Sequence, residues 1–175
     1  MNRAVFLDRD GVLNKVKLQN NLPFPPSSIQ EVEIIDGVLE GVDLLLSSGF
    51  VLVVVTNQPD VARGKATKLE VEEINSYIGK LLGIEHFYTC FHDDVVRCRC
   101  RKPFPGLIQQ AGLELNLNLA SSYLVGDRWR DIAAGQSAGC ETFFIDYSYP
   151  EKQPHKPFTR VSSLLEAASL LVGSK

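Results

Sequence analysis

Short, continuous apolar runs recur along this chain, and they limit its fold more than any other feature of the sequence. Five of them have the length of a β-strand, at residues 4–7, 50–55, 86–90, 123–125 and 142–145. Strands that are covered on both faces are apolar throughout instead of alternating, which is typical of central parallel strands. The runs therefore predict a mostly parallel sheet that is buried on both sides.

Segments with helical spacing lie between these runs. Val38, Val42 and Leu45 share one helical face, and Gly49 is placed to end that helix. Further apolar stripes predict helices at residues 69–82, 107–115, 132–138 and 161–172. Thr67 is placed to cap the first of these. Strands that alternate with helices predict an α/β fold with an open, doubly wound, Rossmann-like sheet.

The length of 175 residues fits one domain, so we expect residues 1–175 to form a single unit. Residues 20–28 and 148–159 lack periodicity and are rich in Pro, Asn or Ser, so they are predicted to be loops. No long insertion interrupts the pattern of strands and helices. The fold should therefore be nearly capless, which means that loops alone must cover any ligand.

Charge and hydropathy exclude several classes of protein. The net charge of −3 and the pI near 5.6 argue against a nucleic-acid partner. The longest apolar stretch near the middle, residues 50–55, is far too short to cross a membrane, and the first residues do not resemble a signal peptide. We therefore expect a cytoplasmic monomer with no membrane partner. In a reducing compartment, cysteines are metal ligands or free thiols more often than disulfides.

Polar residues follow four of the predicted strands. They are Asp8, Thr56 with Asn57, the segment 90–92, and Asp127. In an open parallel sheet, ligands bind outside the carboxyl ends of the strands. The sequence thus predicts that these residues meet at one edge of the sheet.

Asp8 and Asp10 stand two positions apart directly after the first strand, and Gly11 allows a turn that brings both into one cleft. Such a pair suits phosphoryl transfer. Asp8 would attack phosphorus and form an aspartyl-phosphate, while Asp10 would protonate the leaving oxygen and later activate water. A bound Mg²⁺ would offset the repulsion between carboxylate and phosphate. A D-x-D turn is common by itself, so the neighbouring motifs must decide between this role and a solvated turn.

Those motifs supply the groups that a phosphate site needs. The Thr56 hydroxyl, with backbone N–H groups near it, can bind phosphate oxygens. Arg101 and Lys102 precede a predicted helix, whose N-terminus also attracts anions. Asp127 offers a second carboxylate to a metal, whereas Asp131 is interpreted as a first-turn residue that complements the helix dipole and supports the site without being a metal ligand. Each motif also has a structural explanation: a polar turn or an exposed basic pair.

Three cysteines and one histidine stand within eleven residues: Cys90, His92, Cys98 and Cys100. They match the four N and S ligands of a structural zinc site, although the C-x-H and C-x-C spacings are tighter than usual. The alternative is a set of free thiols. Because Arg101 and Lys102 follow Cys100 directly, a bound Zn²⁺ would fix the direction of both cations.

In this order, the motifs resemble the haloacid dehalogenase (HAD) superfamily of phosphatases, and within it the D-glycero-D-manno-heptose 1,7-bisphosphate phosphatases. The resemblance covers residues from about 5 to 145. It is carried by residues 6–14 (FLDRDGVLN), 35–38 (IDGV), 52–58 (LVVVTNQ), 62–65 (ARGK), 100–103 (CRKP) with the Cys/His cluster, and 123–128 (YLVGDR). It implies one HAD-like phosphatase domain, a zinc loop and hydrolysis of a small phosphorylated sugar.

The resemblance also implies roles for single residues. Mg²⁺ would be held by Asp8, the Asp10 carbonyl and Asp127. Thr56 and Lys102 would contact the transferred phosphoryl group. Arg101 would recognise the substrate, and Asn57 and Arg128 would line the same pocket.

The chain departs from the pattern at one place and leaves alternatives open. The heptose enzymes have Asn-Gln-Ser-Gly where this chain has Asn-Gln-Pro59-Asp60. The proline removes a backbone N–H, and Asp60 adds a negative charge near the phosphate site. The contacts to the rest of the substrate therefore differ from the pattern, and the sequence leaves the identity of the sugar open. Arg63 and Lys65 either meet a distal phosphate or form a solvated turn. Histidinol-phosphate phosphatase, another small sugar-phosphate phosphatase and a non-catalytic binding protein are the other candidates.

Overall fold

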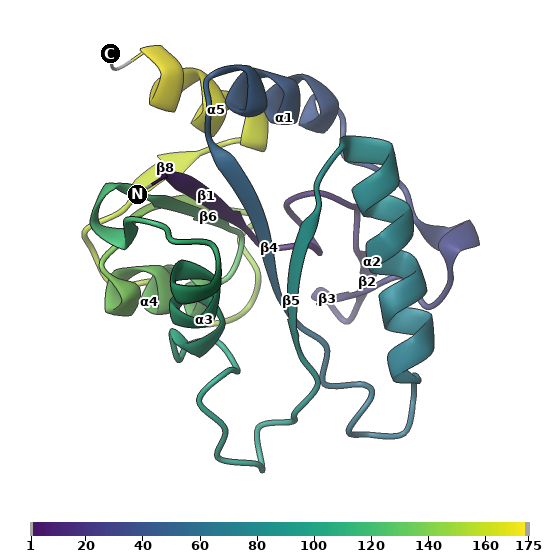
Figure 1. Cartoon of the computed structure of the whole chain (residues 1–175). Helices are drawn as coiled ribbons and strands as arrows, with labels where there is room; N and C mark the ends of the chain where they lie inside the picture. The colour runs from purple at the N-terminus through teal and green to yellow at the C-terminus, as the bar shows by residue number, and fades with distance from the viewer. Residues whose placement is uncertain (1, 174–175) are drawn as a thin grey trace.

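A six-stranded sheet lies at the centre of the computed structural model, which describes residues 2–173 (Figure 1). Its order is β5-β4-β1-β6-β7-β8, and each neighbouring pair is parallel. The strands are β1 (Ala4–Leu7), β4 (Val51–Asn57), β5 (His86–Cys90), β6 (Tyr123–Gly126), β7 (Glu141–Ile145) and β8 (Thr159–Val161). The predicted α/β fold with a mostly parallel sheet is confirmed.

Helices cover both faces of the sheet, which explains why its strands are apolar throughout. One core layer contains α1 (Val38–Ser47), α2 (Lys68–Leu82) and α5 (Leu164–Gly173), and the other contains α3 (Gly106–Glu114) and α4 (Trp129–Ala138). Along β1, Val5 and Leu7 belong to the first layer, while Ala4 and Phe6 belong to the second. Figure 1 shows α1 beside α5, and α3 beside α4.

The helix ends follow their local sequence. Thr67 caps α2 as predicted: its hydroxyl accepts a hydrogen bond from the Glu70 N–H at 3.2 Å, and its own N–H donates to the Glu70 carboxylate at 2.7 Å. Gly49 follows α1 with a φ of +80°, a conformation that glycine adopts readily. Both predictions are confirmed.

Two predicted boundaries are wrong. Residues 159–161 form β8 beside β7, with Ile145 opposite Val161, so the last helix begins at Leu164 and not at Val161. A three-residue strand is too short to show a periodicity. The predicted loop at residues 20–28 includes part of a hairpin, β2 (Lys17–Gln19) and β3 (Leu22–Phe24), followed by the 3₁₀ turn η1 (Ile29–Glu31).

The hairpin turn consists of Asn20 and Asn21, which have φ values of +52° and +60°. Asparagine adopts this conformation more readily than most residues, so the adjacent pair Asn20-Asn21 could have indicated a tight hairpin turn in the sequence. Within residues 2–173, the chain between β1 and α1 forms only this hairpin and η1 as regular structure, so the molecule is nearly capless. None of the described helices is long and apolar enough to span a membrane.

Candidate active site and metal centre

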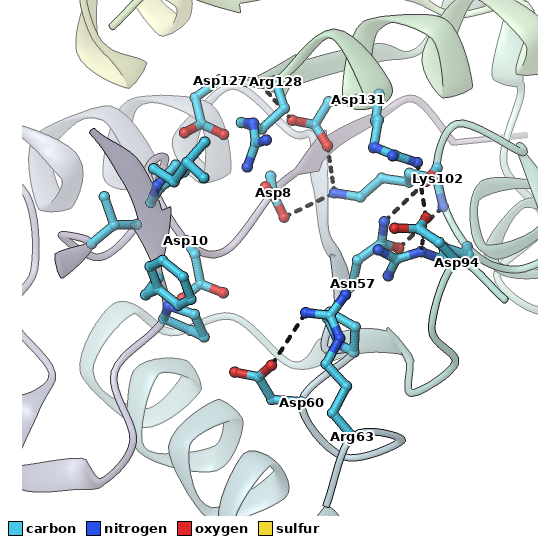
Figure 2. Close-up of a pocket in the computed structure, with 18 residues that line it drawn as sticks. Asp8, Asp10, Asn57, Asp60, Arg63, Asp94, Lys102, Asp127, Arg128 and Asp131 are labelled. Carbon is cyan, nitrogen blue, oxygen red and sulfur yellow. Dashed lines mark hydrogen bonds and ion pairs between the residues drawn. The ribbon is translucent and has the colours of Figure 1, made fainter. Parts of the chain in front are cut away.

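The predicted residues converge at the carboxyl edge of the sheet. A cavity of about 410 Å³ opens there, lined by Asp8, Asp10, Asn57, Arg101, Lys102, Asp127, Arg128 and Asp131 among others (Figure 2). These residues follow β1, β4, β5 and β6, as the strand-end rule predicts. Thr56 is the one predicted phosphate-binding residue that is not among those lining this cavity.

Asp8 is held at the end of β1 by groups from three parts of the chain. Its N–H donates to the Val125 carbonyl at 3.1 Å, and its Oδ1 accepts from the Arg9 N–H and the Lys102 Nζ at 2.8 Å each. Burial, together with the nearby charge of Asp131, raises the pKa of Asp8 to about 7, although Lys102 opposes this shift. A further positive charge beside Asp8 would therefore favour its ionised form.

Asp127 gives the clearest indication of a cation-binding site. It is 1% exposed, and among the described residues neither carboxylate oxygen has a hydrogen-bond partner at normal geometry, although the Tyr149 phenol interacts with this carboxylate. Burial and the charges of Asp8 and Asp131 raise its pKa well above the usual value. Buried polar groups are nearly always paired, so these two oxygens require a ligand. The close approach also explains Gly11, because a Cβ there would lie 2.1 Å from Asp127 Oδ2.

The donor set fits Mg²⁺. One carboxylate oxygen each from Asp8, Asp127 and Asp131 lies within 4.8 Å of the others. Mg²⁺ prefers oxygen ligands and uses one or two carboxylates with water. Lys102 contributes one positive charge to three buried carboxylates, which leaves the cluster short of positive charge.

Asp131 lies in the first turn of α4, as the sequence predicts, and its carboxylate also reaches the carboxylate cluster. Its Oδ2 accepts from the Arg128 N–H at 2.9 Å, as a first-turn residue of α4 does. Its Oδ1 lies 2.6 Å from the Lys102 Nζ, inside the carboxylate cluster. Gly126 permits this, because a Cβ there would lie 2.2 Å from the Asp131 Cβ.

The Asp10 side chain occupies a separate network. It accepts hydrogen bonds from the buried Arg9 at 3.0–3.1 Å, from Asn14 at 3.0 Å and from Gln58 at 2.7 Å. Gln58 also donates to the Thr56 hydroxyl at 2.9 Å, so one amide links the two residues. Sequence reasoning did not assign Gln58 to the site, although its position directly after Asn57 was a signal.

Asn57 positions Lys102. Its Nδ2 donates to the Lys102 carbonyl at 3.0 Å, and its Oδ1 accepts from the Lys102 N–H at 3.1 Å. The Lys102 ammonium also donates to the Val55 carbonyl at 2.7 Å. Burial disfavours its charge, but Asp131 and Asp8 outweigh burial and raise its pKa. Lys102 is therefore a fixed cation between two carboxylates.

The Cys/His cluster forms a second donor set, in the loop after β5. Cys90 Sγ lies 3.5 Å from His92 Nδ1, 3.8 Å from Cys98 Sγ and 3.3 Å from Cys100 Sγ. A tetrahedral Zn²⁺ with bonds of about 2.3 Å to sulfur places two thiolates about 3.8 Å apart. Burial raises the pKa of Cys90 to about 12, so this thiol keeps its proton unless a cation replaces it. The set fits zinc.

The loop that carries the Cys/His cluster also orients Arg101. The Arg101 Nη1 donates to the His92 carbonyl at 3.2 Å, and its Nε donates to Asp94 at 2.9 Å. On the other side of the cavity, Arg128 forms a bidentate pair with Glu151, with 2.7 Å between its Nε and Oε1. Glu151 lies in the connection between β7 and β8. No local motif marks it, because its role depends on how that connection folds.

Comparisons with known proteins agree with this geometry. A family model described as HAD-hydrolase-like matches residues 99–167. The chain is 32% identical over 160 residues to a D-glycero-beta-D-manno-heptose-1,7-bisphosphate 7-phosphatase of Helicobacter pylori. The aligned region covers 88% of this chain and 89% of the relative. The chain is 36% identical over 151 residues to the protein of that name in Escherichia coli K12, over 79% and 76% of the two chains.

A solved structure has the same fold. The D,D-heptose 1,7-bisphosphate phosphatase of B. bronchiseptica, solved with magnesium and phosphate, superposes with a TM-score of 0.86 at 24% identity and covers 99% of both chains. The sequence identities above extend over most of this chain and of its relatives, and the strand-end residues line one cavity. The chain therefore belongs to the D-glycero-beta-D-manno-heptose-1,7-bisphosphate 7-phosphatase family of HAD-like phosphatases.

Proposed function

We propose that this chain hydrolyses D-glycero-β-D-manno-heptose 1,7-bisphosphate at the 7-phosphate, with Mg²⁺ as its cofactor. The observation that carries the proposal is the buried cluster of Asp8, Asp127 and Asp131, in which Lys102 pairs with Asp8 and Asp131 and, among the described residues, no hydrogen bond of normal geometry reaches either Asp127 oxygen. The choice of sugar rests on the relatives, which are named as phosphatases of this heptose bisphosphate.

Asp8 is the proposed nucleophile. One of its carboxylate oxygens attacks phosphorus while the bond to the sugar oxygen breaks, which gives an aspartyl-phosphate and frees the sugar. Lys102 touches Asp8 directly and is placed to neutralise charge on the phosphoryl oxygens. Water then attacks the phosphorus of the intermediate, and inorganic phosphate leaves as Asp8 is restored.

Asp10 is the proposed acid and base. It gives a proton to the departing sugar oxygen in the first step and takes one from water in the second. In the structure its carboxylate accepts hydrogen bonds from Arg9, Asn14 and Gln58. Asp10 also lines the active-site cavity, so these three groups hold its carboxylate at the edge of the proposed substrate site.

The proposed Mg²⁺ ligands are the carboxylates of Asp8 and Asp127 and the carbonyl of Asp10. When bound, the ion neutralises negative charge that develops on the phosphoryl group. Asp131 belongs to the same cluster but already accepts from Lys102 and from the Arg128 backbone. Its proposed role is to hold these two residues in place.

Zn²⁺ at Cys90, His92, Cys98 and Cys100 is proposed to be structural, because four protein ligands leave no open position. Its effect reaches the active site through Arg101, which donates to the His92 carbonyl. Arg101 and Arg128 are proposed to bind the substrate, and Thr56 and Asn57 to support the phosphoryl site. A monomeric state and a cytoplasmic location stay predictions.

Asp8→Asn tests the chemistry. The amide keeps the size of the side chain but is a poor nucleophile, so activity should fall by at least about a thousandfold. Steady-state hydrolysis should be measured with Mg²⁺ on heptose bisphosphate, histidinol phosphate and other sugar phosphates. Retained activity in Asp8→Asn would refute the nucleophile, and a preference for histidinol phosphate would refute the proposed substrate.

A further inference from the structure

Four arginines line the active-site cavity beyond the carboxylate cluster: Arg63, Arg101, Arg128 and Arg130. A substrate with two phosphates needs a second cationic contact away from Asp8, and each arginine is a candidate. The four differ in the number of carboxylates that already neutralise them. That difference decides which part of the rim can accept another anion.

At the Arg63 end of the cavity, carboxylates already neutralise the arginine. Arg63 donates to both oxygens of Asp93, at 2.7 and 2.6 Å, and lies 3.4 Å from Asp60. All three guanidinium nitrogens therefore point at carboxylates, and one positive charge faces two negative ones. Figure 2 shows Asp60 and Arg63 at the opposite end of the pocket from Arg128. A phosphate would be repelled at this end.

The opposite balance holds beside Lys102. Arg101 and Arg130 share one carboxylate oxygen of Asp94, at 2.9 and 3.2 Å, so two positive charges pair with one negative charge; Asp93, which is paired with Arg63, also interacts with Arg101 electrostatically. Among the contacts of the described residues, Arg130 donates only from Nη1. Asp94 is half exposed, which lets it yield to a stronger anion. Arg128 is a weaker candidate, because Glu151 already binds it with both oxygens.

Local structure holds Arg130 in reach of the cavity. It lies in the first turn of α4, one residue before Asp131, whose carboxylate contacts Lys102. Its guanidinium stands 4.8 Å from the centre of the Trp129 ring, which restricts its motion. A small sugar that spans from Asp8 to Arg130 would thus present its two ends to two sites.

We propose that Arg130, together with Arg101, binds the second anionic group of the substrate, a phosphate on the sugar. This inference rests on the proposed function and adds to it the residue that selects a bisphosphate over a monophosphate. The planar guanidinium forks suit the oxygens of a phosphate. Asp60 and Asp93, in contrast, keep Arg63 out of this role.

The test compares KM values for two substrates, heptose 1,7-bisphosphate and the 7-phosphate of the same sugar. Arg130→Gln should raise KM for the bisphosphate by about tenfold. It should leave kcat, and KM for the monophosphate, within about twofold of wild type. Arg130→Lys keeps the positive charge but loses the planar guanidinium group, so its KM for the bisphosphate should lie between those of Arg130→Gln and wild type. A purely structural role would instead change KM for both substrates alike.

Arg63→Gln is the matched comparison, since it removes an arginine from the same cavity. The ratio of its two KM values should stay within about twofold of wild type. Equal ratios in Arg130→Gln and wild type, or a larger change in Arg63→Gln, would overturn the subsite while leaving the phosphatase activity intact. If wild-type protein hydrolyses sugar phosphates but not heptose bisphosphate, the proposed substrate fails, and the same variants on other matched bisphosphate and monophosphate pairs decide the subsite.

Discussion

The two donor clusters of this molecule are built in opposite ways. The Cys/His cluster comes from one short segment, from Cys90 at the end of β5 to Cys100, and its side chains range from the buried Cys90 to the exposed His92. The carboxylate cluster joins Asp8 to Asp127 and Asp131 across neighbouring parallel strands, and it is fully buried. A local cluster needs its metal to order the loop, whereas the sheet holds the carboxylates in place whether or not a metal is bound. Metal loss should therefore change loop order in one case and chemistry in the other.

The largest effect is expected from Asp127→Asn. The amide keeps the shape but removes a metal-ligand charge, so activity should fall by about a thousandfold or more. Without added Mg²⁺, the variant should melt at a higher temperature than wild type, because among the described residues no hydrogen bond of normal geometry reaches either Asp127 oxygen.

Thermal melts with and without Mg²⁺ check this contrast. Wild type should gain stability from the ion, and the variant should gain little. A variant that melts lower than wild type in the absence of Mg²⁺ would show that another group already satisfies Asp127.

Lys102→Met should cost the most stability. Lys102 is 2% exposed and contacts Asp8 and Asp131, so its removal leaves buried negative charges uncompensated. We expect the free energy of unfolding to fall by about 3–5 kcal/mol. Urea denaturation measures the loss. Combining the change with Asp131→Asn should restore part of it, and a purely additive double variant would contradict the coupling between them.

Loss of Zn²⁺ should act locally. In Cys98→Ser, zinc content should drop, and KM for the substrate should rise by about tenfold as Arg101 loses its fixed orientation. The sheet should remain folded by far-UV circular dichroism. Cys140→Ala is the control, because Cys140 is buried away from the cluster and its loss should leave zinc content unchanged. Unfolding of the whole domain on zinc removal would contradict the expectation that the metal orders only this loop.

The same contrast explains what could be predicted from the sequence. Ligands close together in the chain, such as Cys98 and Cys100, show their spacing directly. The distant carboxylates could be placed because parallel strands end at one edge, which brings Asp8 and Asp127 together whatever lies between them. That rule locates the end of a strand, but it does not give the direction of a side chain.

What could not be predicted depends on such directions or on very short elements. The Asp10 carboxylate follows a strand end, yet it points into a network with Arg9 and Gln58. Glu151 reaches Arg128 from a connection whose path no periodicity describes. The strand β8 has three residues, fewer than a pattern of alternation or an apolar run requires.

The smallest effect is expected from Glu151→Gln, which tests whether a long-range contact orients Arg128 beside Asp127. The bidentate pair is partly exposed, so its loss should raise KM for the bisphosphate by only about threefold, with kcat unchanged. Glu141→Gln, on the exposed end of β7, is a matched change of charge outside the cavity. If both variants behave like wild type, Arg128 is held by its backbone and by Tyr149, whose ring centre lies 5.5 Å away. A fall in kcat for Glu151→Gln alone would instead place Arg128 among the groups that act on the transferred phosphoryl group. Catalysis at the carboxylate cluster would then depend on the connection between β7 and β8, which carries Glu151, as well as on the sheet.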